Sequence, residues 1–254
     1  MCEHLLCLYS MTSDKTALVD NTFPVYINDS GEMDVVLFGL QDEKADQFRC
    51  VHELLDQPIT KLNLISPEAL PGLRNTEVKY VDWDYHINLE QFDLDLRGKV
   101  YKNIRYRVNQ TKTLGYQIKY SRKLTPSHLR LIARHAIRHP LDVWDFEELL
   151  SLERFFTEYP HGFMIEAYHR DNLIGFDVVD FFQDHKVMVV PLGIYSDAPA
   201  LADFFMYQNI LYAKQKGYEW LDVGLACREP GLQAFKTKWL AQPRFKLVVQ
   251  TITK

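Results

Sequence analysis

The stretch Val187-Met-Val-Val-Pro-Leu-Gly-Ile-Tyr195, with the segment 200–216 and Tyr218-Glu-Trp-Leu-Asp-Val-Gly-Leu225 after it, decides the fold. The first piece is a run of apolar, β-favouring residues and predicts a buried strand. Segment 200–216 lacks Gly and Pro, and its apolar residues recur three and four positions apart, as in a helix that packs on a sheet. Gly217 is placed to end that helix. A strand, a helix and a second strand predict a right-handed crossover between parallel strands, whose ends face one cleft.

The residues on either side of this crossover extend the same sheet. Upstream, segments 163–168 and 173–182 are apolar or alternating and flank an Asp-Asn turn, which predicts an antiparallel hairpin. Downstream, residues 228–239 predict a short helix that projects Phe235, Lys236 and Trp239. The C-terminal part of the chain therefore reads as hairpin, strand, helix, parallel strand and terminal helix.

Two motifs make the prediction more specific. Gly217–Gly224 is a strand ending in Asp-x-Gly, and Gly231-Leu-Gln-Ala-Phe-Lys-Thr-Lys-Trp239 follows it. Asp84-Tyr-His-Ile-Asn-Leu89 leads to Leu-x-Gly-Lys and a basic segment that ends at Asn109. Together they resemble the GNAT-related acyltransferases that use aminoacyl-tRNA, namely the FemAB-like transferases and the C-terminal domain of the phosphatidylglycerol lysyltransferases. The resemblance covers roughly residues 80 to 245.

This resemblance implies an α/β (α+β) fold, a GNAT-like mixed sheet flanked by helices, with two tandem GNAT-like lobes. We expect residues 1–80 to form a reduced N-terminal lobe, residues 81–123 a connecting strand and basic helix, and residues 124–254 the acyltransferase lobe. Pattern alone predicts strands near 34–39, 61–65 and 77–83 and a helix at 42–55 in the first part. It predicts helices at 125–137 and 142–159 in the second.

Composition is that of a folded chain without a membrane span. The 254 residues are 47% hydrophobic, and no stretch approaches the ~20 apolar residues of a transmembrane helix. The four cysteines include no Cys-x-x-Cys pair, so we expect reduced thiols and a cytoplasmic protein. Cys227 lies just beyond the Asp222–Gly224 strand end. His135 and His139 are four apart, but Pro140 follows directly, and we expect no metal site.

Charge is segregated along the sequence. Nine of the 29 basic residues, and none of the 34 acidic ones, lie between Arg97 and Lys123, although the net charge is −5. Val100, Ile104, Val108 and Thr111 form an apolar stripe in this segment. Its basic residues would lie on another face of the same helix. Such a segment is a candidate anion-binding site, and it is also compatible with an ordinary solvated helix surface.

The loop before the predicted helix 200–216 bears on the acyl donor. Coenzyme-A-binding GNAT proteins carry a glycine-rich loop there, whose backbone N–H groups hold pyrophosphate. Here the loop is Ser196-Asp-Ala-Pro-Ala-Leu201, with no glycine, an acidic residue and a proline that lacks an N–H. This disfavours coenzyme A in the standard pose and is compatible with the tRNA-dependent relatives.

We therefore expect an acyltransferase that moves an activated acyl group, an aminoacyl group from aminoacyl-tRNA, onto an amine or hydroxyl. The resemblance makes Lys236 the residue that supplies positive charge in the cleft, with Asp222 beside it to orient a substrate amine or pair with a lysine. The residues expected to bind substrate are Arg105, Arg107, Lys102, Tyr195 and Trp239. Lys236 would equally fit a solvated position, and Trp239 an ordinary core position.

Two other functions fit the same residues. One is an acetyl-CoA-dependent N-acetyltransferase with a divergent loop, and the other is a non-catalytic module on the same fold that binds RNA or another anion. We expect no tightly bound cofactor in any of these cases. The acceptor, whether small molecule, peptide or lipid head group, stays open, and a lipid would have to be reached from solution.

Overall fold

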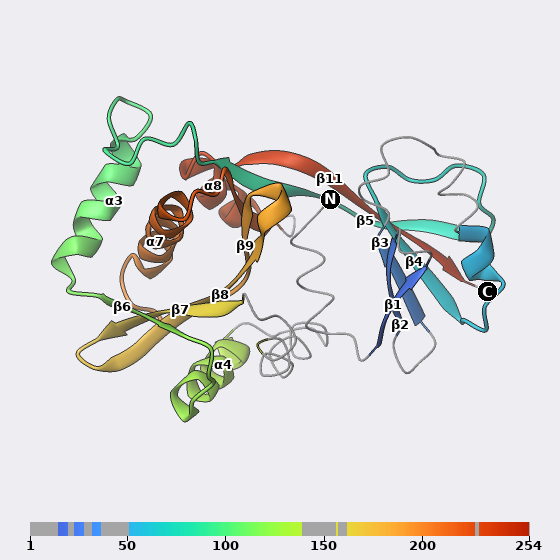
Figure 1. Ribbon diagram of the computed structural model, residues 1–254, viewed down its shortest axis with the longest axis horizontal. Coiled ribbons are helices and arrows are strands. Elements are labelled where there is room, and N and C mark those ends of the chain that lie inside the picture. Colours follow the sequence, from blue (N-terminus) through green and yellow to red (C-terminus); the bar gives the residue numbers. More distant parts are fainter. Residues whose placement is uncertain are drawn as a thin grey trace.

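The computed structural model describes residues 15–19, 23–27, 32–36, 51–138, 156, 162–226 and 229–253. In this part of the chain, eleven strands form one continuous mixed sheet in the order β1-β2-β3-β4-β11-β5-β10-β9-β8-β7-β6 (Figure 1). The strands are β1 (Lys15–Val19), β2 (Phe23–Ile27), β3 (Glu32–Val36), β4 (Lys61–Ser66), β5 (Thr76–Asn88), β6 (Gln117–Ser121), β7 (Phe163–His169), β8 (Asn172–Phe182), β9 (Val187–Tyr195), β10 (Trp220–Leu225) and β11 (Gln242–Thr253). The helices are α3 (Lys102–Thr113), α4 (Pro126–Arg138), α7 (Leu201–Gln215) and α8 (Pro230–Lys238), and a 3-10 turn, η1, spans Gln183–His185.

The predicted C-terminal core is confirmed. β7 and β8 form an antiparallel hairpin, β8 pairs antiparallel with β9, and β9 pairs in parallel with β10 after the crossover through α7. The hairpin turn is centred one residue earlier than expected, because Arg170 and Asp171 both adopt positive φ angles (49° and 63°). Two consecutive left-handed residues match the twist of the two strands in a tight hairpin.

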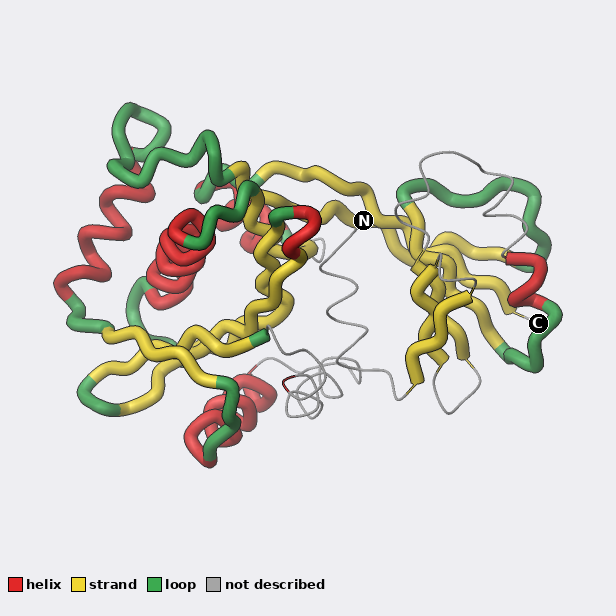
Figure 2. The backbone as a smooth tube through the Cα atoms, in the orientation of Figure 1, coloured by secondary structure: helices red, strands yellow, loops and turns green. Residues whose placement is uncertain are grey.

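The helices cover both faces of the C-terminal half of the sheet (Figure 2). One face buries a large core beneath α3 and α7, in which Ile104 and Val108 of α3 pack with Phe205 and Ile210 of α7. The other face packs against α4 through Leu131. Val100 of the predicted apolar stripe is 61% exposed, because α3 begins two residues after it.

The N-terminal half is smaller and has its own core. β1, β2 and β3 form an antiparallel meander, and β3 pairs in parallel with β4. Residues 51–55 are helical, and Val51 and Leu54 pack with Val35, Leu62 and Leu64. The remainder of the helix predicted at 42–55 and the helix predicted at 142–159 lie outside the described residues, apart from Phe156, as do Cys227 and His139.

Two long strands join the halves into one sheet. β5 pairs with β11 from Thr76–Ile252 to His86–Gln242, and its last residues also pair with β10. The far end of β11 pairs with β4, so residues 248–253 complete the N-terminal half (Figure 1). Residue 80, where the N-terminal lobe was expected to end, lies within β5, and the two halves share backbone hydrogen bonds along β5 and β11.

The start of α7 has no side-chain cap, although Ser196 and Asp197 lie just before it in the sequence. The N-cap residue is Ala200, which has a φ of 54° and makes no side-chain cap hydrogen bond. None of the described helices is long and apolar enough to cross a membrane.

A substitution at Gln250 of β11 measures how much this strand stabilises the N-terminal half. Its buried amide donates to the carbonyl of Leu70 (3.0 Å) and accepts from the Leu70 N–H (2.8 Å). Gln250→Ala leaves both backbone groups without their partner, so we expect a loss of about 2 kcal/mol in the free energy of unfolding, measured by urea denaturation. The matched control is Gln242→Ala, an exposed glutamine on the same strand, which should change it by less than about 0.5 kcal/mol. Equal effects of the two substitutions would contradict this role.

Candidate functional site

The cavity between β9 and β10 is the candidate site. The two strands pair only from Val187–Trp220 to Val189–Asp222, and beyond that point they diverge. A cavity of about 540 Å³ opens in the gap. Its wall combines residues from β8, β9, β10, α4, α7 and α8, mostly apolar, and the polar side chains among them are His135, Asp177, Tyr195, Asn209 and Lys236. The predicted cleft at the end of the crossover is present, and it contains two of the residues predicted for it, Lys236 and Tyr195.

Lys236 holds the end of β10 in place. The residue is 4% exposed. Its ammonium donates hydrogen bonds to three consecutive carbonyls, those of Val223 (2.6 Å), Gly224 (2.6 Å) and Leu225 (2.5 Å). Gly224 has a φ of 72°, a left-handed conformation that favours glycine, and its N–H donates to Asp222 Oδ1 at 2.8 Å. The Asp-x-Gly and Phe-Lys motifs are therefore two parts of one structure, in which the glycine turns the carbonyls towards the lysine.

The wall of the same cavity also contains a buried carboxylate, that of Asp177 on β8. Asp177 Oδ1 accepts a hydrogen bond from the Tyr195 hydroxyl (2.5 Å), and Oδ2 accepts one from Asn209 Nδ2 (2.6 Å). Burial raises the pKa of Asp177 to about 7, although both hydrogen bonds oppose that rise. Burial and the neighbouring carboxylate also raise the pKa of Tyr195 well above its usual value. Asp177 is thus poised to gain or lose a proton near neutral pH.

Gly193 makes room for this polar group. A Cβ atom at position 193 would lie 2.6 Å from Asp177 Oδ1 and still closer to the Tyr195 hydroxyl oxygen. Both separations are far shorter than a carbon–oxygen contact allows. The glycine in the middle of β9 is therefore required for the hydrogen bond between Asp177 and Tyr195.

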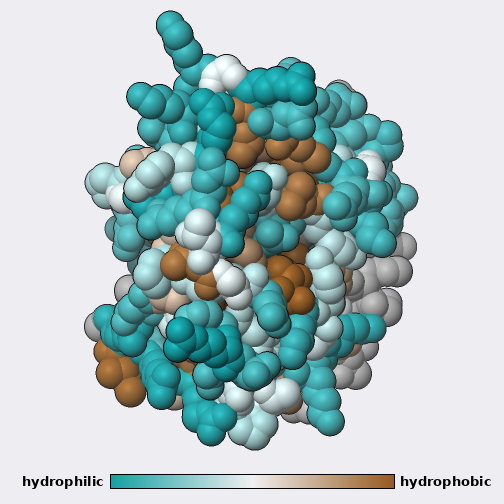
Figure 3. Space-filling view, turned by 90° about the vertical axis from the view of Figure 1, so that its left-hand side faces the viewer, coloured by the Kyte–Doolittle hydropathy of each residue, from teal (hydrophilic) through white to brown (hydrophobic). Residues whose placement is uncertain are grey.

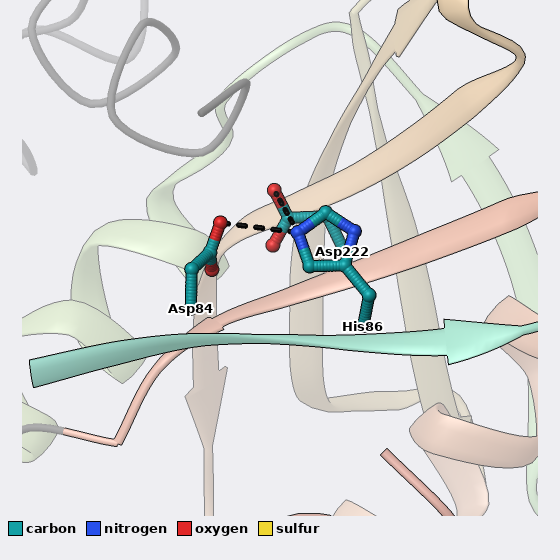
Figure 4. A group of neighbouring side chains, drawn as sticks. All are labelled: Asp84, His86 and Asp222. Atoms are coloured by element: carbon teal, nitrogen blue, oxygen red, sulfur yellow. Dashed lines mark hydrogen bonds and ion pairs between the residues drawn. The ribbon is translucent and has the colours of Figure 1, made fainter. Parts of the chain in front are cut away.

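Asp222 also belongs to a second buried group, which it forms with Asp84 and His86 of β5 (Figure 4). His86 Nε2 lies 3.1 Å from Asp84 Oδ2 and 3.7 Å from Asp222 Oδ2. One ligand atom from each residue lies within 4.8 Å of the others, and two carboxylates with an imidazole are ligands that a transition metal accepts. His86 borders another cavity of about 500 Å³, with Asn88 and Trp220. Asp222 thereby couples the end of β10 to β5.

The basic helix lies on a different side of α7 from the cavity. Lys102, Arg105 and Arg107 are exposed, on an end of the molecule whose surface is mostly polar (Figure 3). Arg105 donates to the carbonyl of Leu96, and Arg107 Nε lies 3.7 Å from Asp203 Oδ2. These three basic residues are not among the described residues that line the cavity. The structure therefore does not bring these three predicted substrate-binding residues together with Lys236 and Tyr195, because α3 packs across α7 through Ile104 and Val108.

Trp239 belongs to the core, the second of the two positions that its sequence context allowed. It is fully buried, and its indole N–H donates to Asp203 Oδ1 at 2.8 Å. Lys238 bonds the same oxygen. Because Arg107 approaches Asp203 from α3, this one carboxylate links α3, α7 and α8.

Sequence reasoning missed Asp177, Asn209 and the pair Asp84 and His86. A signal existed for Asp177, since it is a charged residue in the apolar run 173–182 of a strand that must be buried. Asn209 carries no comparable signal, because a polar residue on one turn of a long helix is ordinary. Asp84 and His86 lie two apart on a strand and therefore share a face, but their neighbour Asp222 is 136 positions beyond His86 in the printed sequence.

Comparison with solved structures confirms the predicted fold. The chain is similar over its whole length to 88% of the C-terminal domain (DUF2156) of a putative lysylphosphatidylglycerol synthetase from Agrobacterium fabrum, at 12% identity and a TM-score of 0.66. It is similar over 91% of its length to 78% of a tandem GNAT protein from the clavulanic acid biosynthesis pathway (11% identity, TM-score 0.62). It is similar over 96% of its length to 90% of FemX (9% identity, TM-score 0.61). No protein-family model and no curated protein matches the sequence. The chain thus has a GNAT-like fold, a mixed sheet flanked by helices.

The three hydrogen bonds of Lys236 predict a structural cost for its removal. Lys236→Met keeps most of the aliphatic stem but leaves three buried carbonyls without their donor, so we expect a loss of about 2–4 kcal/mol in the free energy of unfolding. Chemical denaturation measures it. Lys99→Met, at an exposed lysine, is the control and should lie within about 0.5 kcal/mol of the wild type. A wild-type stability of Lys236→Met would remove the lysine from this role.

The raised pKa of Asp177 predicts a pH dependence of stability. The folded chain keeps the Asp177 proton up to about pH 7, whereas the unfolded chain loses it near the ordinary value of 3.8. Stability should therefore fall as pH rises between these values, by about 1.4 kcal/mol per pH unit at most. Asp177→Asn should flatten the slope relative to the wild type, because asparagine carries no ionisable proton in this pH range. The Asn209 amide can turn and offer its oxygen to the new side chain, which preserves a hydrogen bond at this position.

Urea denaturation at intervals from pH 4 to pH 8 measures both slopes. Burial also raises the pKa of Asp34, to about 6, so the wild type retains a second contribution in the same range. Only the difference between wild type and Asp177→Asn reports on Asp177. Parallel curves would show that Asp177 is ionised throughout the range.

Proposed function

We propose that this chain is an acyltransferase that moves an aminoacyl group from aminoacyl-tRNA onto an amine or hydroxyl acceptor. The observation that carries the proposal is the cavity where β9 and β10 diverge. A reaction of this kind needs a place where an ester carbonyl is held against a nucleophile while donors meet the developing negative charge. The motifs that resemble the aminoacyl-tRNA-dependent transferases, Asp222–Gly224 and Phe235–Lys236, lie at the rim of this cavity.

The open edge of β9 is the candidate for holding the acyl carbonyl. Beyond Val189, the edge of β9 that faces β10 is no longer paired with it. Backbone N–H groups on such an edge point across the gap, except at Pro191, which has none. A substrate carbonyl placed between the strands would accept from this edge, and the tetrahedral intermediate would strengthen the same hydrogen bonds.

The chemical step is an acyl transfer between two nucleophiles. The acceptor nitrogen or oxygen attacks the ester carbonyl, the new bond forms, and the bond to the ribose oxygen breaks. The proton that the acceptor loses balances the charge on the leaving ribose oxygen. Lys236 contributes a buried positive charge near the cavity and holds Gly224 and Leu225 in place, and Asp222 supports the same turn.

The basic helix is the proposed tRNA contact. Lys102 and Arg105 are exposed on α3, away from the cavity, where a long polyanion could lie while its end enters the gap. Coenzyme A fits the loop before α7 less well. Asp197 pairs with Arg138 at 2.6 Å, and the Tyr116 hydroxyl donates to the Pro199 carbonyl at 2.9 Å. That loop offers a carboxylate and a carbonyl where pyrophosphate would need donors.

Charged tRNA and acetyl-CoA, tested side by side, examine this function. We expect a mixture of tRNA charged with radiolabelled amino acids to lose label to acceptors supplied as amines, phosphatidylglycerol vesicles or cell extract, and acetyl-CoA to give no transfer. Binding of tRNA without consumption of the aminoacyl group would favour the RNA-binding module. Transfer from acetyl-CoA alone would favour the N-acetyltransferase.

The tRNA contact has its own test. The double variant Lys102→Ala, Arg105→Ala should weaken tRNA binding and reduce the slope of log K against log salt by about 1–2. The charge-matched control is Arg74→Ala, Lys79→Ala, two exposed basic residues of the N-terminal half. Filter binding from 50 to 200 mM salt measures the slope. If both double variants behave alike, α3 is not the contact.

A further inference from the structure

We propose that Asp177, Tyr195 and Asn209 form a recognition site for the protonated amino group of the acyl donor. The inference rests on the proposed function in taking the cavity between β9 and β10 as the acyl pocket. It goes further by assigning three residues to one part of the substrate. An acetyl group has nothing to place there, whereas an aminoacyl group carries an ammonium next to its carbonyl.

The charge balance of the cavity favours a cation. The Asp177 carboxylate is only 1% exposed, and its two hydrogen bonds come from neutral groups, a phenol and an amide. None of the described residues gives this carboxylate a cationic hydrogen-bond partner, and a buried carboxylate without one is costly, which is why its pKa is raised. An ammonium that enters the cavity would supply the missing charge.

The positive charge already present in the cavity wall is not available for this purpose. All three N–H groups of the Lys236 ammonium are directed to the carbonyls of residues 223–225. The Lys236 ammonium therefore has no N–H group directed at Asp177, and a different cation is needed to pair with this carboxylate. Among the described residues of the wall, the other titratable groups are His135 on α4 and Tyr195 on β9.

Asn209 provides the second, independent observation. The residue lines the cavity and is 2% exposed, and its Oδ1 accepts no hydrogen bond from the described residues. Its Nδ2 is already directed at Asp177 Oδ2, which fixes the orientation of the amide. A buried acceptor without a donor is rare in folded proteins and indicates a missing partner. Asp177 and Asn209 together offer several acceptor positions, and an ammonium brings three donors.

The binding experiment uses two small probes and no tRNA. L-leucinamide carries an ammonium next to a carbonyl, and N-acetyl-L-leucinamide is the same molecule without the positive charge. Isothermal titration at pH 7 should show that the wild type binds L-leucinamide and binds the acetylated probe at least about tenfold more weakly. Asp177→Asn should remove most of that preference.

Two further variants make the result specific. Asp180→Asn is the matched control, because Asp180 is a buried aspartate on the same strand that is not among the residues lining the cavity, and its preference should equal that of the wild type. Tyr195→Phe removes one of the two hydrogen bonds to Asp177 and should change the preference less than Asp177→Asn. It also provides a milder test should Asp177→Asn fail to fold, which thermal unfolding detects.

Each other result overturns the proposal. These results are equal binding of the two probes by the wild type, no measurable binding of L-leucinamide, or an unchanged preference in Asp177→Asn. An Asp177→Asn variant that binds L-leucinamide normally but transfers aminoacyl groups more slowly would make Asp177 a proton acceptor in catalysis instead. Charge-dependent binding of L-leucinamide without any transfer from charged tRNA would refute the proposed function and leave this site standing.

Discussion

The candidate site depends on one constraint, the three hydrogen bonds from the Lys236 ammonium to three consecutive carbonyls. A strand that leaves its parallel neighbour exposes carbonyls that must find other donors. Lys236 supplies those donors, Gly224 bends the chain so that they can be reached, and Asp222 fixes the bend through the Gly224 N–H. With the end of β10 held in this way, β10 can part from β9 and leave a cavity in the middle of a sheet.

The two charged groups of the cavity wall, Lys236 and Asp177, differ in the hydrogen-bond partners that they have. The lysine donates to backbone oxygens, whereas the Asp177 carboxylate accepts hydrogen bonds from two neutral groups among the described residues. The basic face of α3 lies outside the cavity and is tied to the rest of the lobe through Asp203. This arrangement separates a surface suited to a polyanion from an interior suited to a small cation, and an aminoacyl ester has both parts.

Local patterns in the sequence were sufficient for the crossover, the hairpin and the basic helix, because each is specified by residues within about twenty positions of one another. They were insufficient for β11, although Leu247-Val-Val-Gln-Thr-Ile252 is rich in β-branched residues. The residues of a strand do not determine with which other strands it pairs. The same limit applies to the site. Lys236 and Tyr195 follow from a motif and a strand end, whereas Asp177 meets Asn209 only through the packing of α7 on the sheet.

The double pairing of β11 has a consequence for the order of assembly. This strand is made after every strand that it joins, and Gln250 reaches back 180 positions to Leu70. During synthesis, one edge of β4 and most of β5 therefore remain unpaired until β11 has been made. Unpaired strand edges of this kind can pair with other chains and so promote aggregation. A nascent chain stalled before residue 242 would thus be a candidate for chaperone binding, even if its first hundred residues had already formed their strands.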